Sequence, residues 1–572
     1  MMVWLNSRWQ KGLVLFLLLV AFILTHRFFF LTGDFPTHDG VHFIRLYNLE
    51  RILGEGQFPP RWLPDLGKGY GYPFFNFYPP LSYFAGMIFR FLGTSFTLAN
   101  KLSFALAGLV GTISIFFLGK LLFGFWGGAI SALFWLFLPY RALSIYVRGT
   151  LAEYWGMNLL PLAFYFAKSF FDQQNIKKFL CLTFSLFLIL IAHNAVALIG
   201  LAWLVVFVLF LFVANRDWSW TKLKQGAFFD FSFILALGMA AFFILPAILE
   251  KNLTHIADMT SGYYAYYNHF PSLRQLFLSR YWNYGGSVFG IEDGMSFQIG
   301  HFHWLAVFLT LALLGWRWLS DRKFFYQDKK ACLPLFFLVF FWFFAFLSHQ
   351  RSIFIWQGLP FLAFLQFPWR FLIFIGLSAS VLAGFLVNWL RKGFFLVFVF
   401  LFLALLGLNF NYFQPRERLA INDQSYLSYP LWQYQQREFL TDYLPKTVKE
   451  VPEDHYQPPL VVAQEKVEIS LNRADKIIFA ALLPKEEEVI IKRFYFPGWQ
   501  ARVNKELVDI RTNENGFMVL SLPEGKVVVE ISLQDTSVRR VANWISLFSW
   551  GAFLFFTLTG RFLPKNFFKK ND

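Results

Sequence analysis

Residues 12–31, GLVLFLLLVAFILTHRFFFL, are predominantly apolar, and the chain then turns polar over residues 34–80, DFPTHDGVHFIRLYNLERILGEGQFPPRWLPDLGKGYGYPFFNFYPP. A run of this kind meets the requirement of roughly 20 apolar residues for one helix across a bilayer. A helix also pairs its own backbone polar groups, which lipid demands. We therefore expect a first membrane span followed by a polar loop beside the membrane.

The composition extends this prediction to most of the chain. Of the 572 residues, 57% are hydrophobic and 22% aromatic, and only 15% are charged, whereas soluble domains carry about 25% charged residues. We predict a polytopic α-helical membrane protein with about twelve transmembrane helices. The predicted spans are residues 12–31, 97–119, 121–139, 154–172, 178–193, 195–214, 228–249, 302–319, 331–347, 369–390, 393–411 and 541–560.

The basic residues predict the orientation of these spans. The net charge of +16 is spread between the spans and forms no single stripe, which does not favour a nucleic-acid partner. If the N terminus with Arg8 and Lys11 is cytoplasmic, the later basic clusters are cytoplasmic too, as the positive-inside rule requires. These clusters are Lys120, Lys168–Lys178, Arg216–Lys224, Arg317–Lys330, Arg391–Lys392 and Lys565–Lys570. We expect a multi-pass plasma-membrane protein with both termini cytoplasmic and the large loops outside.

This topology divides the chain into four parts. Residues 1–411 form the transmembrane domain, with outer loops 32–96, 140–153, 250–301 and 348–368. Within the first loop, residues 80–93 are too short to span and contain Arg90, so we expect a helix at the outer interface. The other three parts are a connector at 412–459, an extracytoplasmic β-sandwich-like module at 460–540, and a last span with a basic tail at 541–572. The module is predicted from alternating apolar segments separated by turn residues.

Asp39 in the first outer loop is the first candidate catalytic residue. His38, His42 and Arg45 follow one another at spacings of four and three, so on a helix they share one face close to Asp39. A carboxylate held beside such groups can act as a general base. Alternatively, Asp39 is the N-cap of a helix over residues 41–53 and only accepts backbone N–H groups. The sequence permits both roles together.

Glu153 at the end of the second outer loop is the second candidate. A carboxylate at the mouth of a span is costly unless it faces water, forms an ion pair or binds a ligand. It could pair with Arg148 or Arg141 and order the loop. It could also orient an acceptor, or join Asp39 around a divalent cation, Mg²⁺ or Mn²⁺, because hard cations prefer oxygen ligands. No spacing in the sequence demonstrates that metal.

Two further groups lie at the height expected for a lipid headgroup. His193 and Asn194 interrupt an apolar region, where they either bind a ligand or cap and turn a helical hairpin. Arg351 and Arg370 lie near a Pro- and aromatic-rich segment that ends in QFPWR (366–370). Arginine suits phosphate oxygens, although Trp and Arg are also common interfacial anchors.

The order of these segments resembles the GT-C membrane glycosyltransferases. More closely, it is similar to a bacterial membrane family labelled 6-pyruvoyl-tetrahydropterin synthase-related, a relative of the YfhO-like membrane proteins. The motifs that carry this resemblance are His38-Asp39, Arg45, Gly56, PPRW (59–62), GYGYP (69–73), FYPPLSY (77–83), LPYRALSIYVRGTLAE (138–153), AHN (192–194), QFPWR (366–370) and FPGW (496–499). None of these residues indicates pterin chemistry.

The resemblance implies a glycosyltransferase that uses a polyprenyl-phosphate-linked sugar and an envelope glycan, lipid or protein acceptor at the outer face. Asp39 and Glu153 match the acidic residues of the first and second loops, although RGTLAE lacks the paired acidic motif of oligosaccharyltransferases. Arg351 or Arg370 would hold the donor phosphate. Two alternatives remain open: a non-catalytic scaffold of envelope polysaccharide synthesis that binds through the β-module, and a transporter of lipid-linked glycans.

Overall fold

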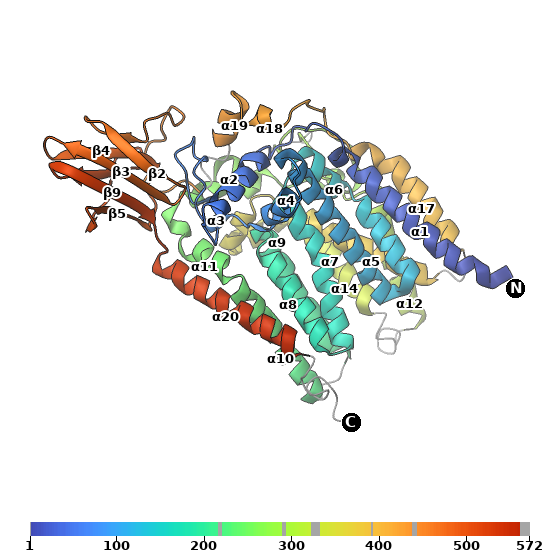
Figure 1. Ribbon diagram of the computed structural model, residues 1–572. Coiled ribbons are helices and arrows are strands. Elements are labelled where there is room, and N and C mark those ends of the chain that lie inside the picture. Colours follow the sequence, from blue (N-terminus) through green and yellow to red (C-terminus); the bar gives the residue numbers. More distant parts are fainter. Residues whose placement is uncertain are drawn as a thin grey trace.

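The computed structural model describes residues 2–215, 220–288, 293–321, 332–389, 393–437 and 443–560. Long helices form a bundle, and a β-module projects from one end of it, which we call the module end (Figure 1). The α-helices are α1 (Met2–His26), α2 (His42–Gly54), α3 (Phe74–Phe77), α4 (Leu81–Phe91), α5 (Phe96–Leu136), α6 (Pro139–Ala142), α7 (Leu151–Asp172), α8 (Ile176–Leu190), α9 (Asn194–Asn215), α10 (Trp220–Met239), α11 (Ala241–Leu249), α12 (His301–Ser320), α14 (Cys332–Ser348), α15 (Ile353–Gly358), α16 (Leu372–Leu386), α17 (Phe394–Asn409), α18 (Asp423–Tyr426), α19 (Leu431–Arg437) and α20 (Ser537–Thr559).

Helices occupy the predicted spans, which confirms a polytopic helical membrane protein. Among the described residues, 7 helices are long and apolar enough to cross a membrane, or up to 9 if each of two bent pairs counts as one span. The predicted number of twelve therefore stays a prediction. Helix α4 has only 11 residues, too few for a span of roughly 20. Several basic clusters, namely 216–219, 322–330, Arg391–Lys392 and Lys565–Lys570, lie outside the described residues, so the orientation also stays a prediction.

Helix α5 covers two of the predicted spans because it is a hairpin. At Gly124 the backbone leaves helical geometry, with φ 78° and ψ −177°. The two legs then pack closely: a Cβ on Gly119 would lie 2.7 Å from Ser131 Oγ and 3.0 Å from Gly128 Cα. Small residues permit such close approach of helices in a membrane. The legs carry residues 96–123 and 125–136, and the second leg leads directly into the second loop.

The β-module contains two antiparallel sheets, with strand orders β1-β4-β8-β7 and β2-β3-β9-β5-β6. Val529 on β9 pairs with Phe479 on β3 and with Val503 on β5, and all three side chains are buried. Along β5, buried and exposed residues alternate. Two sheets with such buried inner positions agree with the predicted sandwich-like module. The strands are β1 (Val461–Val462), β2 (Val467–Asn472), β3 (Lys476–Leu483), β4 (Glu487–Phe494), β5 (Trp499–Val503), β6 (Glu506–Val508), β7 (Arg511–Thr512), β8 (Phe517–Leu522) and β9 (Gly525–Leu533).

The module packs against the first loop. The backbone N–H of Ala474 donates to Glu55 Oε2 at the end of α2, at 2.6 Å. The rings of Trp62 and Trp499 meet edge to face at 5.5 Å, and Tyr70 lies 4.7 Å from Phe517. Aromatic pairs of this geometry add about 0.5–1.5 kcal/mol beyond the area they bury. The module is thus part of the wall that supports the first loop.

A buried ion pair fixes the last helix to the bundle. Arg539 in the first turn of α20 lies 2.9 Å from Glu250 Oε2 at the end of α11, and both side chains are under 5% exposed. Arg539→Met would leave the Glu250 charge buried without its partner, which costs about 3–5 kcal/mol. We expect a clear fall in the thermal unfolding temperature in detergent, whereas Arg540→Met, at the exposed neighbouring position, should leave it unchanged. Equal unfolding temperatures for the two variants would contradict this role.

Candidate active site

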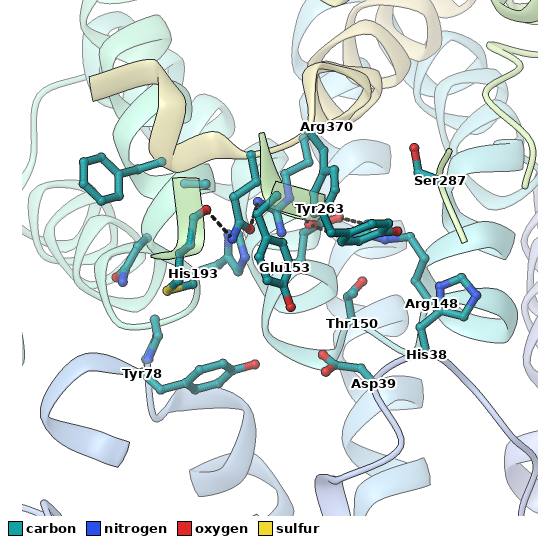
Figure 2. A pocket seen from close by; sticks show the side chains of 18 of the residues that line it. His38, Asp39, Tyr78, Arg148, Thr150, Glu153, His193, Tyr263, Ser287 and Arg370 are labelled. Carbon is teal, nitrogen blue, oxygen red and sulfur yellow. Dashed lines mark hydrogen bonds and ion pairs between the residues drawn. The ribbon is translucent and has the colours of Figure 1, made fainter. Parts of the chain in front are cut away.

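A cavity of about 420 Å³ lies at the module end, where loops from distant parts of the chain meet. Figure 2 shows Asp39 and Thr150 on one side of it and the group around Glu153 and Arg370 on the other. An apolar part of the wall is contributed by Ala247, Ile256, Met259, Phe364 and Phe367. Among the predicted site residues, those that line the cavity are His38, Asp39, Arg45, Arg148, Glu153, His193, Asn194 and Arg370.

Asp39 presents an uncommitted carboxylate to this cavity. The predicted role as N-cap is wrong: α2 begins after Val41, which has no side-chain cap. The backbone N–H of Asp39 donates to Arg148 O at 2.9 Å and thereby fixes the residue against the second loop. Its carboxylate forms no hydrogen bond or ion pair with the described part of the chain. A partly buried acid in this state is free to accept a proton from a bound molecule.

In contrast to Asp39, Glu153 has both of its carboxylate oxygens engaged in hydrogen bonds. It lies in the first turn of α7 and is 1% exposed. Oε1 accepts from Tyr140 Oη at 2.7 Å and from Arg148, and Oε2 accepts from Arg148 Nη2 at 3.1 Å and from Arg370 Nε at 3.0 Å. The ion pair with Arg148 that we considered as the alternative is present. A carboxylate that balances two guanidinium groups is held in its charged form.

The two arginines of this network are aimed by the QFPWR segment. The Arg148 guanidinium stacks over Trp369 at 4.4 Å, and the Trp369 indole donates to Ser287 Oγ at 3.2 Å. Arg370 Nη1 donates to Leu365 O at 2.6 Å, and its Nη2 has no hydrogen bond to a described residue. Arg370 therefore keeps the two N–H donors of Nη2 available to a molecule in the cavity.

His193 contributes a neutral donor. Its Nδ1 accepts the backbone N–H of Val196 at 3.3 Å, which assigns the ring hydrogen to Nε2. Asn194 begins α9 and donates to Phe77 O at 3.4 Å. The pair thus turns the hairpin, as the alternative proposed, and also lines the cavity.

Two predicted site residues lie elsewhere. The buried ring of His42 is held between Tyr83 Oη at 3.0 Å and Gly149 O at 2.5 Å, behind the second loop and away from this cavity. Helical spacing placed His42 correctly on α2 but could not show which neighbour it faces. Arg351 is exposed near α15 and does not line the cavity. The structure therefore does not bring His42 and Arg351 to this cavity with the other predicted residues.

The other two first-loop residues have partly committed side chains. His38 Nε2 contacts Tyr284 O at 3.1 Å and connects the first loop to residues 250–301. The Arg45 guanidinium donates to Tyr83 Oη at 3.2 Å and lies 4.7 Å from the Phe74 ring centre. Arg45 thereby adds positive charge to the wall close to Asp39.

The residues of this site do not fit a divalent metal. Such a cation needs several free oxygen ligands, but both Glu153 oxygens are taken by arginine and tyrosine donors. Arg148 and Arg370 also place two positive charges against Glu153, which would repel a cation there. Across the described residues, no group of three or more His, Cys, Asp or Glu side chains could hold a metal ion.

Several cavity residues were not predicted. Tyr78, Thr150, Gln366 and Trp369 line the cavity, and each lies inside a motif quoted above. These four side chains are uncharged, so their residue type alone does not mark them as binding residues. Ser287 and Tyr443 also line the cavity, but they carry no signal in the sequence because uncharged loop residues are common.

Known proteins resemble this chain in sequence and in fold. A model of the family described as "6-pyruvoyl-tetrahydropterin synthase related domain; membrane protein" matches residues 75–413. A protein of Lactococcus lactis subsp. cremoris (strain MG1363), described as an uncharacterized protein, is 21% identical over 255 residues, 43% of this chain and 41% of that protein. The crystal structure of the Archaeoglobus fulgidus oligosaccharyltransferase in the apo form has a TM-score of 0.44 and 12% identity, covering 80% of this chain and 62% of that chain. Each of these two matches covers less than two thirds of the other protein.

Proposed function

This chain belongs to the membrane-protein family described as 6-pyruvoyl-tetrahydropterin synthase related, and from that premise we propose that it is a GT-C-type glycosyltransferase. It would move a sugar from a polyprenyl-phosphate donor to an acceptor at the outer face of the membrane. The observation that carries the proposal is the unpaired carboxylate of Asp39, which shares a cavity with the Arg148–Glu153–Arg370 network.

The cavity supports an amphipathic donor. Arg370 Nη2 and His193 Nε2 are hydrogen-bond donors suited to phosphate oxygens. The apolar wall around Phe364 and Phe367 suits the first part of a prenyl chain. With the phosphate between these groups, the sugar would extend toward Asp39.

In the proposed reaction, Asp39 accepts the proton of an acceptor hydroxyl as its oxygen attacks the anomeric carbon. The bond from that carbon to the phosphate oxygen breaks, and the electron pair leaves with the polyprenyl phosphate. The positive wall stabilises the charge that develops on the leaving phosphate, and a site shielded from water strengthens that effect. The new glycosidic bond, the protonated carboxyl and the free lipid phosphate balance the reaction.

The location of the site supports an enzyme rather than a transporter. Glu153 lies in the first turn of α7, His193 precedes α9, and Arg370 precedes α16. These are helix ends on the module side of the bundle, whereas transporters place polar groups near the bilayer midplane. The positive-inside rule would put this end outside the cell, where the donor needs no nucleotide.

The proposal is tested with the full chain reconstituted in vesicles that contain polyprenyl-phosphate sugars. A panel of donors, each with a radiolabelled sugar, is mixed with membrane extracts as acceptors, and the release of polyprenyl phosphate is measured together with labelled product. We expect one donor class to be consumed. If no donor is consumed and the protein does not bind undecaprenyl phosphate, the glycosyltransferase proposal fails and a scaffold role through the β-module is favoured.

The positive charge of the site gives a further prediction. Because arginines already compensate the developing phosphate charge, we expect EDTA to leave the transfer rate unchanged. Parallel reactions with added Mg²⁺ or Mn²⁺ provide the control. A loss of activity in EDTA that Mn²⁺ restores would show that a cation takes part.

A further inference from the structure

The QFPWR segment contains a strained residue that the proposed reaction does not use. Gln366 has φ 62° and ψ −47°, a conformation that side-chain-bearing residues rarely adopt, and it is only 5% exposed. The N–H of Phe367 donates to Leu365 O at 2.6 Å across it. These angles and this bond define a γ-turn with positive φ, which is rare and strained. Strain of this kind persists only where surrounding contacts hold it, and it clusters at functional sites.

The turn brings two acceptors to Arg370. Leu365 O accepts from Arg370 Nη1 at 2.6 Å, and the Gln366 side-chain Oε1 accepts from the same nitrogen at 3.1 Å. Phe367 is extended and Pro368 starts the next helical turn, so the chain folds back and places Arg370 beside Gln366. With Nε on Glu153, the guanidinium is held on two sides and its Nη2 is directed away from these partners.

The same side chain connects Arg370 to the loop across the cavity. Gln366 Nε2 donates to Met259 O at 3.1 Å, and Met259 lines the apolar wall. One amide therefore joins the arginine to residues 250–301 of the chain. A displacement of Met259 would therefore displace the Gln366 amide, which holds the Arg370 guanidinium.

We propose that Gln366 is a positioning residue: its strained turn and bridging amide set the orientation of Arg370 for an anionic lipid headgroup and couple it to the seating of loop 250–301. The identification of the ligand as a lipid headgroup depends on the proposed function, but the positioning of Arg370 by Gln366 does not. The two parts are therefore tested by separate measurements.

The first measurement needs no ligand. Gln366→Asn keeps an amide residue that tolerates positive φ but is one methylene too short to reach Arg370, and Gln366→Gly removes both the amide and the strain. In the full chain in detergent, the rate at which phenylglyoxal modifies Arg370 is followed by peptide mass spectrometry, with exposed Arg351 as internal reference. We expect several-fold faster modification of Arg370 in both variants, without a lower unfolding temperature for Gln366→Gly. An unchanged rate of Arg370 modification, or an equal increase in the rate of Arg351 modification, would overturn the proposal.

The second measurement uses undecaprenyl phosphate in nanodiscs. Gln366→Asn should weaken binding about tenfold, as expected from loss of one hydrogen bond to a charged group. In an Arg370→Met background the same change should have no further effect, because Gln366 acts through Arg370. A loss that persists without Arg370 would refute positioning. Faster Arg370 modification together with no binding by the unaltered protein would uphold positioning and reject the lipid-phosphate ligand.

Discussion

Asp39→Asn is expected to abolish sugar transfer while the protein folds and inserts normally. The carboxylate has no hydrogen bond to a described residue, so the nearly isosteric amide breaks no hydrogen bond of the fold. It does remove the proton acceptor, and general-base catalysis contributes about 10²–10⁴-fold in rate. Initial rates of product formation in vesicles, measured beside the thermal unfolding temperature in detergent, check both halves of this expectation.

Asp258→Asn is the matched control, because Asp258 is an exposed acid in the loop that helps to enclose the same cavity. It should retain the activity of the unaltered protein. Retained activity in Asp39→Asn would remove Asp39 from the mechanism. A large fall in the unfolding temperature of Asp39→Asn would instead show that Asp39 stabilises the fold.

Glu153→Gln is expected to cause a large loss of stability. Glu153 compensates the charges of Arg148 and Arg370 in a buried network, and a neutral amide would leave both guanidinium groups uncompensated. Breaking a buried pair by removing one partner costs about 3–5 kcal/mol. We expect a large fall in the thermal unfolding temperature and loss of transfer activity.

The double variant Glu153→Gln, Arg370→Met separates charge balance from other effects. It removes one of the uncompensated charges and should recover part of the lost stability, although not the activity. A stable but inactive Glu153→Gln protein would contradict the compensating role and would make Glu153 a direct participant in the chemistry.

Local patterns predicted much of the fold. Helix α2, expected over residues 41–53, occupies His42–Gly54, and alternating apolar residues predicted the β-module between residues 460 and 540. Hydropathy could not show that Gly124 turns two spans into one tight hairpin, because that depends on small residues facing each other across the turn.

The candidate site was predictable in its residues more than in their partners. The Arg148–Glu153 pair lies within one loop and was considered from the sequence. The Arg370–Glu153 contact joins residues 217 positions apart, and no local pattern reports it. The positive φ of Gln366 could not be predicted from the sequence either, because glutamine has no preference for positive φ and tertiary contacts impose it.

The packing of the β-module on the first loop has a consequence for biosynthesis. The first outer loop, which carries Asp39, is translated before its partners Ala474, Trp499 and Phe517, and the helices of the bundle lie between them in the sequence. The nascent protein must therefore keep this loop unassembled while every intervening helix is inserted. A chain that terminates before the module would therefore reach the membrane without the contacts that complete the packing of its first loop.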